Sequence, residues 1–226
     1  MTKPLLAILL LLPLSVSAGE RLQEFTLSAG GKISFPGDGE LKARLRAGAL
    51  EIAVIESYRP EGCGTLVDLS GTIGPDSTYL LRKQLKNACN EGGIFFFLNS
   101  FGGFVDDGLA LAELINQMGG RAYLYDGACY SSCAVAFLGS NKRGVMGSPV
   151  LGFHSPYTVE DGEARCRPDS RLKDLFIRQL GEEDGSFAHR RMQDFCGPEA
   201  MWSINVDTMK LLGIIEEEDV VEPISR

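Results

Sequence analysis

Apolar residues along the chain fall into short runs that alternate, from Thr65 onward, with segments of helical spacing. Residues 94–98 form an uninterrupted apolar run, which is typical of a strand covered on both faces. In the next segment, apolar residues recur at i, i+3, i+4 and i+7, namely at Leu111, Leu114, Ile115 and Met118. That spacing predicts an amphipathic helix. Strands and helices in alternation indicate an α/β fold with mostly parallel strands.

The same alternation continues toward the C-terminus. Strands are predicted at 65–70, 121–126, 143–146 and 150–154, and helices at 75–90, 131–138, 170–180, 186–194 and just before Leu212-Gly213. Gly127 is expected to end the strand before it, and a last strand is expected before the acidic segment 216–219. The helices that follow the charged stretch 160–169 are expected to form a C-terminal helical arm.

The N-terminal part divides into two segments. Residues 1–18 have the pattern of a secretory signal peptide, with an apolar run at 5–14 and small residues at Val16 and Ala18. This run is well short of the roughly 20 residues that span a bilayer. Residues 19–60 are expected to form a small β preface with turns at Gly30-Gly31 and Pro36-Gly37. We therefore expect a soluble, exported protein whose main α/β domain is 61–226.

The amino-acid composition limits the classes of function that the protein can have. Of 226 residues, 44% are hydrophobic and 23% are charged, as in a globular domain with a sizeable core. The formal net charge is −8. Because phosphate backbones bind to basic surfaces, this balance excludes nucleic-acid binding as the main function.

The cysteines indicate an oxidised protein. There are six, an even number, at positions 63, 89, 129, 133, 166 and 196. After export, at least two disulfides are expected. Cys129 and Cys133 are one helical turn apart, and helix side chains rarely reach disulfide geometry, so each is expected to pair elsewhere. The cysteine and histidine spacings fit no zinc site, and we expect neither a metal nor a cofactor.

Residues that could take part in catalysis lie at the ends of three predicted strands. Gly102-Gly103 follow the apolar strand, Ser131 follows the next strand, and His154 ends a later one. Ligands of open α/β sheets bind at the carboxyl ends of strands, so these residues are expected to converge. The glycines suit an oxyanion hole, Ser131 a nucleophile and His154 a general base. Each also has an ordinary structural alternative: a strand-to-helix turn for the glycines, a helix N-cap for Ser131 and a buried side chain for His154. His189 is expected on a solvated helix face.

The surrounding motifs carry a resemblance to a known family. They are Asn99-Ser-Phe-Gly-Gly103, Gly127-Ala-Cys-Tyr-Ser131 and Gly152-Phe-His-Ser-Pro156. In this order and spacing, over about residues 66–156, they resemble the Clp protease proteolytic subunit family of the ClpP/crotonase superfamily. The run Cys129-Tyr-Ser-Ser-Cys133 is more similar to exported bacterial ClpP-like proteins, which implies a location in the bacterial periplasm. The resemblance implies a fold of repeated β-β-α units.

Site roles also follow from this resemblance. It implies Ser131 as nucleophile, His154 as general base, and the backbone N–H groups of Gly103 and Ser132 as oxyanion donors. Phe101 stands where the family has a proline.

The resemblance leaves the acid of a catalytic triad open. The family's aspartate aligns loosely with residues 195–198, which contain no carboxylate. Asp194, Glu199 or no residue at all therefore remain as alternatives.

Three functions fit these observations. The first is an exported serine hydrolase, a peptidase acting on peptide or protein substrates, for which the family's rings allow a homo-oligomer. The second is a catalytically inactive binding module with the same fold, which Phe101 and the unassigned acid favour. The third is a crotonase-type enzyme that uses coenzyme A, but export argues against this cytosolic cofactor and none is expected.

Overall fold

The computed structural model describes residues 20–28, 32–60, 62–197 and 199–221. The expected signal peptide and the expected turn at Gly30-Gly31 lie outside these residues. No helix within the described ranges is both long enough and apolar enough to cross a membrane.

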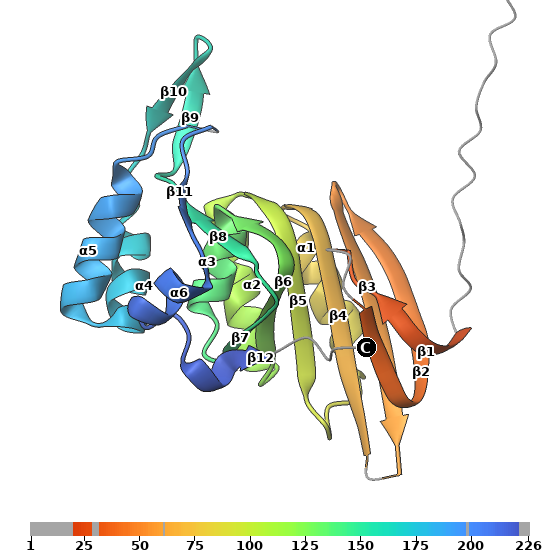
Figure 1. The fold of residues 1–226 in the computed structure, drawn as a ribbon. Coiled ribbons are helices and arrows are strands. Elements are labelled where there is room, and N and C mark those ends of the chain that lie inside the picture. The colour runs from red at the N-terminus through yellow and green to blue at the C-terminus, as the bar shows by residue number, and fades with distance from the viewer. Residues whose placement is uncertain (1–19, 29–31, 61, 198, 222–226) are drawn as a thin grey trace, which may run out of the picture.

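A mixed sheet, ten-stranded over the described residues, forms the centre of the molecule (Figure 1). Its main order is β1-β2-β3-β4-β5-β6-β7-β12, and β8 pairs with β6 and β11. The first four strands are antiparallel neighbours, and those from β4 to β12 along this order are parallel. The strands are β1 (Glu20–Thr26), β2 (Lys32–Ala47), β3 (Leu50–Arg59), β4 (Gly62–Ile73), β5 (Ile94–Gly103), β6 (Arg121–Tyr130), β7 (Arg143–Met146), β8 (Val150–Phe153), β11 (Trp202–Ile204) and β12 (Val220–Val221).

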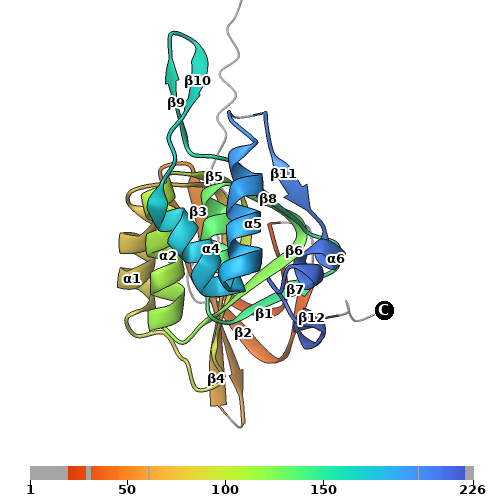
Figure 2. The same cartoon turned by 90° about the vertical axis from the view of Figure 1, so that its left-hand side faces the viewer.

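The helices pack against one another in chain order, each touching the next from α1 to α5 (Figure 2). They are α1 (Ser77–Leu85), α2 (Val105–Gln117), α3 (Ser132–Gly139), α4 (Ser170–Leu180), α5 (Glu182–Gln193) and α6 (Val206–Leu211), followed by a short 3₁₀ turn at Glu217–Asp219. A separate hairpin of β9 (Tyr157–Glu160) and β10 (Glu163–Cys166) projects from the body of the molecule.

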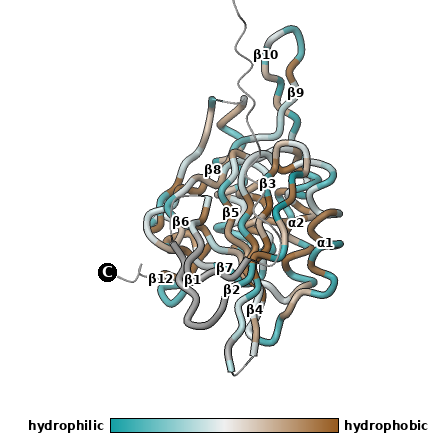
Figure 3. Tube along the Cα trace, turned by 90° about the vertical axis from the view of Figure 1, so that its right-hand side faces the viewer, coloured by the Kyte–Doolittle hydropathy of each residue, from teal (hydrophilic) through white to brown (hydrophobic). Residues whose placement is uncertain are grey.

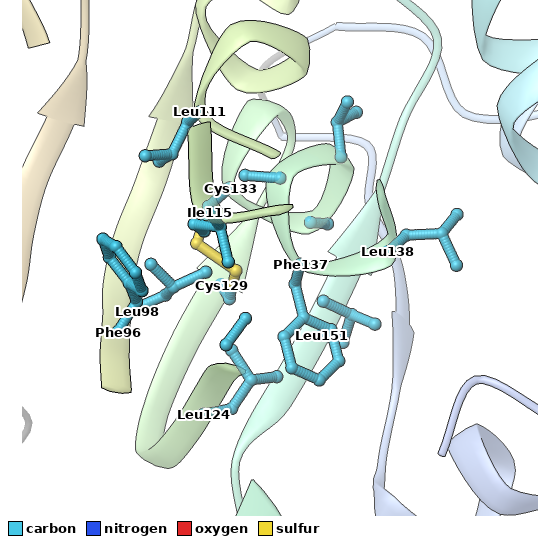
Figure 4. Packing of buried hydrophobic residues seen from close by; sticks show 14 of the residues in the cluster. Phe96, Leu98, Leu111, Ile115, Leu124, Cys129, Cys133, Phe137, Leu138 and Leu151 are labelled. Atoms are coloured by element: carbon cyan, nitrogen blue, oxygen red, sulfur yellow. A yellow bond between two sulfur atoms is a disulfide. The ribbon is translucent and has the colours of Figure 1, made fainter. Parts of the chain in front are cut away.

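Helix α3 lies at the centre of the main core. All of its residues are buried, and Phe137 packs among side chains from the sheet and from α2 (Figure 4). Hydrophobic positions follow the sheet strands and the helices that face them (Figure 3). Because a close-packed interior moves little, the start of α3 is a rigid place on which to mount a side chain.

Local turn signals were poor guides to where strands end. Gly127 lies inside β6, where the strand changes partner: Tyr125 still pairs with β7, and Ala128 begins the pairing with β8. Pro36-Gly37 likewise lies inside β2, where the register with β1 shifts. Both turn predictions are wrong because pairing with a neighbouring strand resumes beyond the irregularity.

Two further elements differ from the prediction. The last strand, β12, follows the acidic segment instead of preceding it, and pairs with β7. The hairpin β9–β10 was not predicted, because charged residues in 160–169 hide its alternation.

Candidate active site

The three predicted strand ends meet at one edge of the sheet. β5, β6 and β8 are parallel neighbours, so Gly102-Gly103, Ser131 and His154 come from adjacent carboxyl ends. Ser131 and His154 line one small cleft, whose other walls are Val105, Ser132, Val135, Phe153, Pro156, Leu172 and Met192. The expected convergence is therefore present in the fold.

Ser131 stands on a sharp turn between β6 and α3. Its φ of 56° lies in the left-handed region, which is uncommon for a residue with a side chain. Its N–H donates to the carbonyl of Gly152 at 2.9 Å, and its carbonyl accepts from the N–H of Val135 at 3.0 Å. The side chain makes no capping bond to α3. Although Ser131 occupies the N-cap position, its hydroxyl is not used for capping.

Gly102 lies against this turn from the β5 side. Its φ is 105°, and a Cβ built on it would lie 2.6 Å from Ser131 Cβ and 2.7 Å from the carbonyl oxygen of Tyr130. A Cβ on Gly103 would overlap the carbonyl oxygen of Ile73. Both positions therefore require glycine, the first because the nucleophile candidate sits against it.

His154 is held by the main chain. Its Nδ1 lies 2.8 Å from the carbonyl oxygen of Ser155, and its ring lies beside Tyr157, 5.4 Å between ring centres. A carbonyl oxygen only accepts, so this contact requires the proton on Nδ1 and leaves Nε2 unprotonated in the neutral ring. Among the described residues, no hydrogen bond joins Ser131 to His154; such bonds often tighten only when substrate binds.

No carboxylate orients His154 in the described part of the chain. The Asp194 carboxylate accepts from Arg191 at 3.0 Å, and both Asp194 and Glu199 are exposed. The backbone of Phe195 and Cys196 lies beside Ser155 instead, and Ser155 N–H donates to Phe195 O at 2.8 Å. The segment that aligned loosely with the family's aspartate is therefore near the histidine, but it contributes backbone only.

Removing either carboxylate should leave turnover intact. We expect Asp194→Asn and Glu199→Gln each to change kcat/KM of the hydrolysis proposed below by less than about twofold, because neither side chain contacts His154. Steady-state kinetics on a peptide ester measure this. A loss of two orders of magnitude in either variant would identify the missing acid and contradict the assignment of the Ser155 carbonyl.

The start of α3 offers N–H groups to an anion. Ser132 is the first helical residue, so its N–H has no carbonyl partner within the helix. Its side chain is buried, and Oγ has no hydrogen-bond partner. Charge developing on a substrate oxygen near Ser131 would be stabilised there by the helix dipole.

Of the comparisons with known proteins, the one with solved structures identifies the fold. No family model matches the sequence, and no curated protein matches it. Among solved structures, a ClpP1 mutant from Listeria monocytogenes is similar, with a TM-score of 0.51 and 17% identity over 68% of this chain and 88% of that chain. This chain has a ClpP-like fold. The ClpP protease catalytic domain from Plasmodium falciparum also matches, at a TM-score of 0.48 and 18% identity over 70% of this chain and 84% of that chain.

Three disulfides join all six cysteines within this ClpP-like fold. They are Cys63–Cys89, Cys129–Cys133 and Cys166–Cys196. The expectation of at least two disulfides is confirmed, but separate partners for Cys129 and Cys133 were wrong. Cys129 belongs to β6 and not to the helix, and the turn at Ser131 brings the two Cα atoms to 5.1 Å. This separation lies in the range that disulfides span.

One cluster of potential metal ligands occurs among the described residues. It consists of Cys63, Cys89 and Glu91. Because the two cysteines form a disulfide, neither supplies the thiolate that a metal requires.

His189 is buried, contrary to the expected solvated face. Its ring packs edge-on against Phe176 between α4 and α5, and its Nε2 has no hydrogen-bond partner. Two arginines follow it in sequence, which suggested a polar helix face, but the tight contact between α4 and α5 covers the ring. Burial lowers the pKa of the His189 imidazole, and the nearby charge of Lys173 lowers it further.

This burial predicts acid sensitivity. The folded state favours neutral His189, so its contribution to stability is complete above the unfolded pKa of about 6.5 and is lost as pH falls through the lowered folded pKa. We expect the Tm of the wild type to fall more between pH 8 and pH 5 than that of His189→Leu. Parallel thermal unfolding curves for both proteins over that range would contradict this.

Proposed function

We propose that this protein is an exported serine peptidase in which Ser131 is the nucleophile and His154 the general base. One observation carries the proposal. A serine on a strained turn, with its hydroxyl free of capping, shares a cleft with a histidine whose Nδ1 is bonded to a carbonyl and whose Nε2 is left to accept a proton. The ClpP-like fold supports it, as does the resemblance of the motifs around Ser131 and His154 to the Clp protease proteolytic subunit family.

In the first half of the reaction, Ser131 Oγ attacks the scissile carbonyl carbon as His154 Nε2 takes its proton. The carbonyl oxygen becomes an oxyanion, which accepts hydrogen bonds from the N–H groups of Ser132 and Gly103. The imidazolium then donates its proton to the leaving amine, the carbon–nitrogen bond breaks, and an acyl-enzyme remains on Ser131.

In the second half, His154 removes a proton from water as the water oxygen attacks the ester carbonyl. A second tetrahedral intermediate forms, and its collapse returns the proton to Ser131 Oγ and releases the acid product. The same two N–H groups stabilise both intermediates.

The Ser155 carbonyl replaces a triad carboxylate as the orienting group. It sets the tautomer and the ring position of His154, but it carries no full charge to stabilise the imidazolium. A neutral group that orients the histidine is compatible with catalysis, as in Cys-His-Asn proteases. In a serine protease, replacing the aspartate so that the histidine takes the wrong tautomer lowers kcat by about 10⁴-fold. Since the tautomer here is correct, we expect slow but real turnover.

Export is part of the proposal. The signal-like residues 1–18 support it, and so do the three disulfides, because an oxidising compartment such as the periplasm maintains them. Mass spectrometry of secreted protein should find Gly19 at the N-terminus. Retention of Met1 in a membrane fraction would reject this part.

The proposal also includes that the protein acts on peptide or protein substrates and that several copies of it assemble. Phe101 and Phe104 flank the two glycines and are exposed, so an extended peptide would meet aromatic side chains on its way to Ser131. Sedimentation of the mature protein measures its state of assembly.

A fluorophosphonate tests the chemistry directly, because it reacts with an activated serine much faster than with an ordinary serine hydroxyl. We expect stoichiometric labelling of the wild type on the peptide that contains Ser131 and no labelling of Ser131→Ala. If the folded wild type takes up no probe at any pH from 6 to 9, the peptidase proposal fails and a binding module with this fold takes its place.

A further inference from the structure

We infer that the Cys129–Cys133 disulfide is a positioning element that keeps Ser131 from capping helix α3, and so keeps its hydroxyl available in the cleft. The inference rests on the proposed function only for its catalytic consequence. The claim that the disulfide controls the conformation of the turn at Ser131 does not depend on that function.

The disulfide closes a covalent ring around the turn. Cys129 is near the end of β6, Cys133 is in the first turn of α3, and Ser131 lies midway between them. With their Cα atoms 5.1 Å apart, the end of the strand and the start of the helix are tied together. The only backbone left to bend outward is Tyr130 to Ser132, with the nucleophile candidate at its apex.

Both ends of this ring are anchored in the core. Cys129 and Cys133 are 1% and 0% exposed, and Figure 4 shows the sulfur–sulfur bond among Leu98, Ile115 and other side chains of the sheet and α2. Cys129 is also paired in register with Ser100 of β5 and Leu151 of β8. The ring therefore cannot rotate as a unit without disturbing three strands.

A serine in front of a helix has a competing conformation. An N-cap residue normally adopts extended φ and ψ, and its hydroxyl accepts a hydrogen bond from the N–H two or three residues later. Ser131 occupies the N-cap position but has a φ of 56° and no such bond. Reaching the capped state would require the turn to open and β6 to move relative to α3, which the disulfide prevents. Without it, the same serine would gain a cap and lose its exposure to substrate.

The first test measures Ser131 capping through stability. Tm is compared in four proteins: wild type, Ser131→Ala, Cys129→Ala/Cys133→Ala, and the triple variant. With the disulfide present, Ser131→Ala should shift Tm by less than about 1 °C, because no cap bond is lost. In the variant without the disulfide, adding Ser131→Ala should lower Tm by about 2–4 °C relative to Cys129→Ala/Cys133→Ala, since it removes a cap that has formed. Equal shifts in the two backgrounds would overturn the inference.

The second test measures the catalytic consequence, with a matched control. Cys129→Ala/Cys133→Ala should label with the fluorophosphonate at least about tenfold more slowly than wild type, with kcat reduced and KM little changed. Cys63→Ala/Cys89→Ala removes a disulfide that joins β4 to the segment before β5, away from the cleft. It should lower Tm but label at the wild-type rate. Equal labelling rates for the two disulfide variants would overturn the inference.

The two tests separate this inference from the proposed function. If the wild type does not label at all, the peptidase proposal fails, and the stability comparison still decides whether the disulfide controls capping.

Stepwise reduction replaces these variants if Cys129→Ala/Cys133→Ala does not fold. Dithiothreitol converts each disulfide to two thiols and becomes a cyclic disulfide itself. The partly exposed pairs Cys63–Cys89 and Cys166–Cys196 should be reduced before the fully buried pair Cys129–Cys133. Mass spectrometry of alkylated peptides should show that labelling survives reduction of Cys63–Cys89 and disappears with reduction of Cys129–Cys133. Labelling that persists with Cys129 and Cys133 alkylated would overturn the inference.

Discussion

Ser131→Ala and His154→Ala are each expected to reduce kcat by about 10⁴-fold or more, and the double variant is expected to lose little beyond either single one. The proposed nucleophile and base act in the same step, so once one is absent the other has nothing to contribute. Residual turnover would come from the N–H groups of Gly103 and Ser132, which both variants keep. Kinetics on a peptide ester, with the folded fraction checked by circular dichroism, measure this.

Ser132→Ala is the matched control. Its proposed contribution is a backbone N–H, which alanine retains, and its buried hydroxyl has no partner to lose. Activity should therefore stay near wild type. Ser131→Ala should also remain folded, since the Ser131 side chain makes no capping bond. If Ser131→Ala hydrolyses peptide and ester substrates at the wild-type rate, Ser131 is not the nucleophile.

Gly102→Ala is expected to inactivate the protein while leaving the other site residues unchanged. The new methyl group would lie 2.6 Å from Ser131 Cβ, and two carbon atoms cannot remain at that separation. Either β5 or the Ser131 turn must shift, and a displacement of about 1 Å at a reacting group can cost about 10²-fold in rate. We therefore expect fluorophosphonate labelling to slow by at least about 10²-fold.

Gly119→Ala separates this contact from backbone strain. Gly119 also has a positive φ, 65°, but a Cβ there meets no atom within 4 Å. Alanine should cost about 1 kcal/mol of unfolding free energy from the left-handed backbone alone and leave labelling unchanged. Equal labelling rates in Gly102→Ala and Gly119→Ala would show that the contact between Gly102 and Ser131 does not position the nucleophile.

Hydrophobic periodicity was sufficient to predict the framework of the site. The apolar run at 94–98 became β5, the i, i+3, i+4 pattern became α2, and the short apolar segment after Ser131 became α3. Because parallel neighbours end at the same edge of a sheet, these local patterns were also enough to expect Gly102, Ser131 and His154 together.

Features of the site that depend on contacts between distant segments of the chain could not be predicted from hydrophobic periodicity. The orienting partner of His154 is the carbonyl of Ser155, and every residue has a carbonyl, so no side-chain signal could reveal it. The burial of His189 depends on how α4 meets α5, and the end of β6 depends on β8 replacing β7 as its partner.

The disulfide that flanks Ser131, the proposed nucleophile, shows the same division. That Cys129 and Cys133 flank Ser131 at equal distance is evident from the order of residues alone. Their pairing depends on the fold, because β6 continues to Tyr130 and the chain turns sharply at Ser131 before α3 begins. Periodicity reports which face of an element is apolar. Where one element ends and the next begins is set by strand pairing and core packing, which involve residues far apart in the chain.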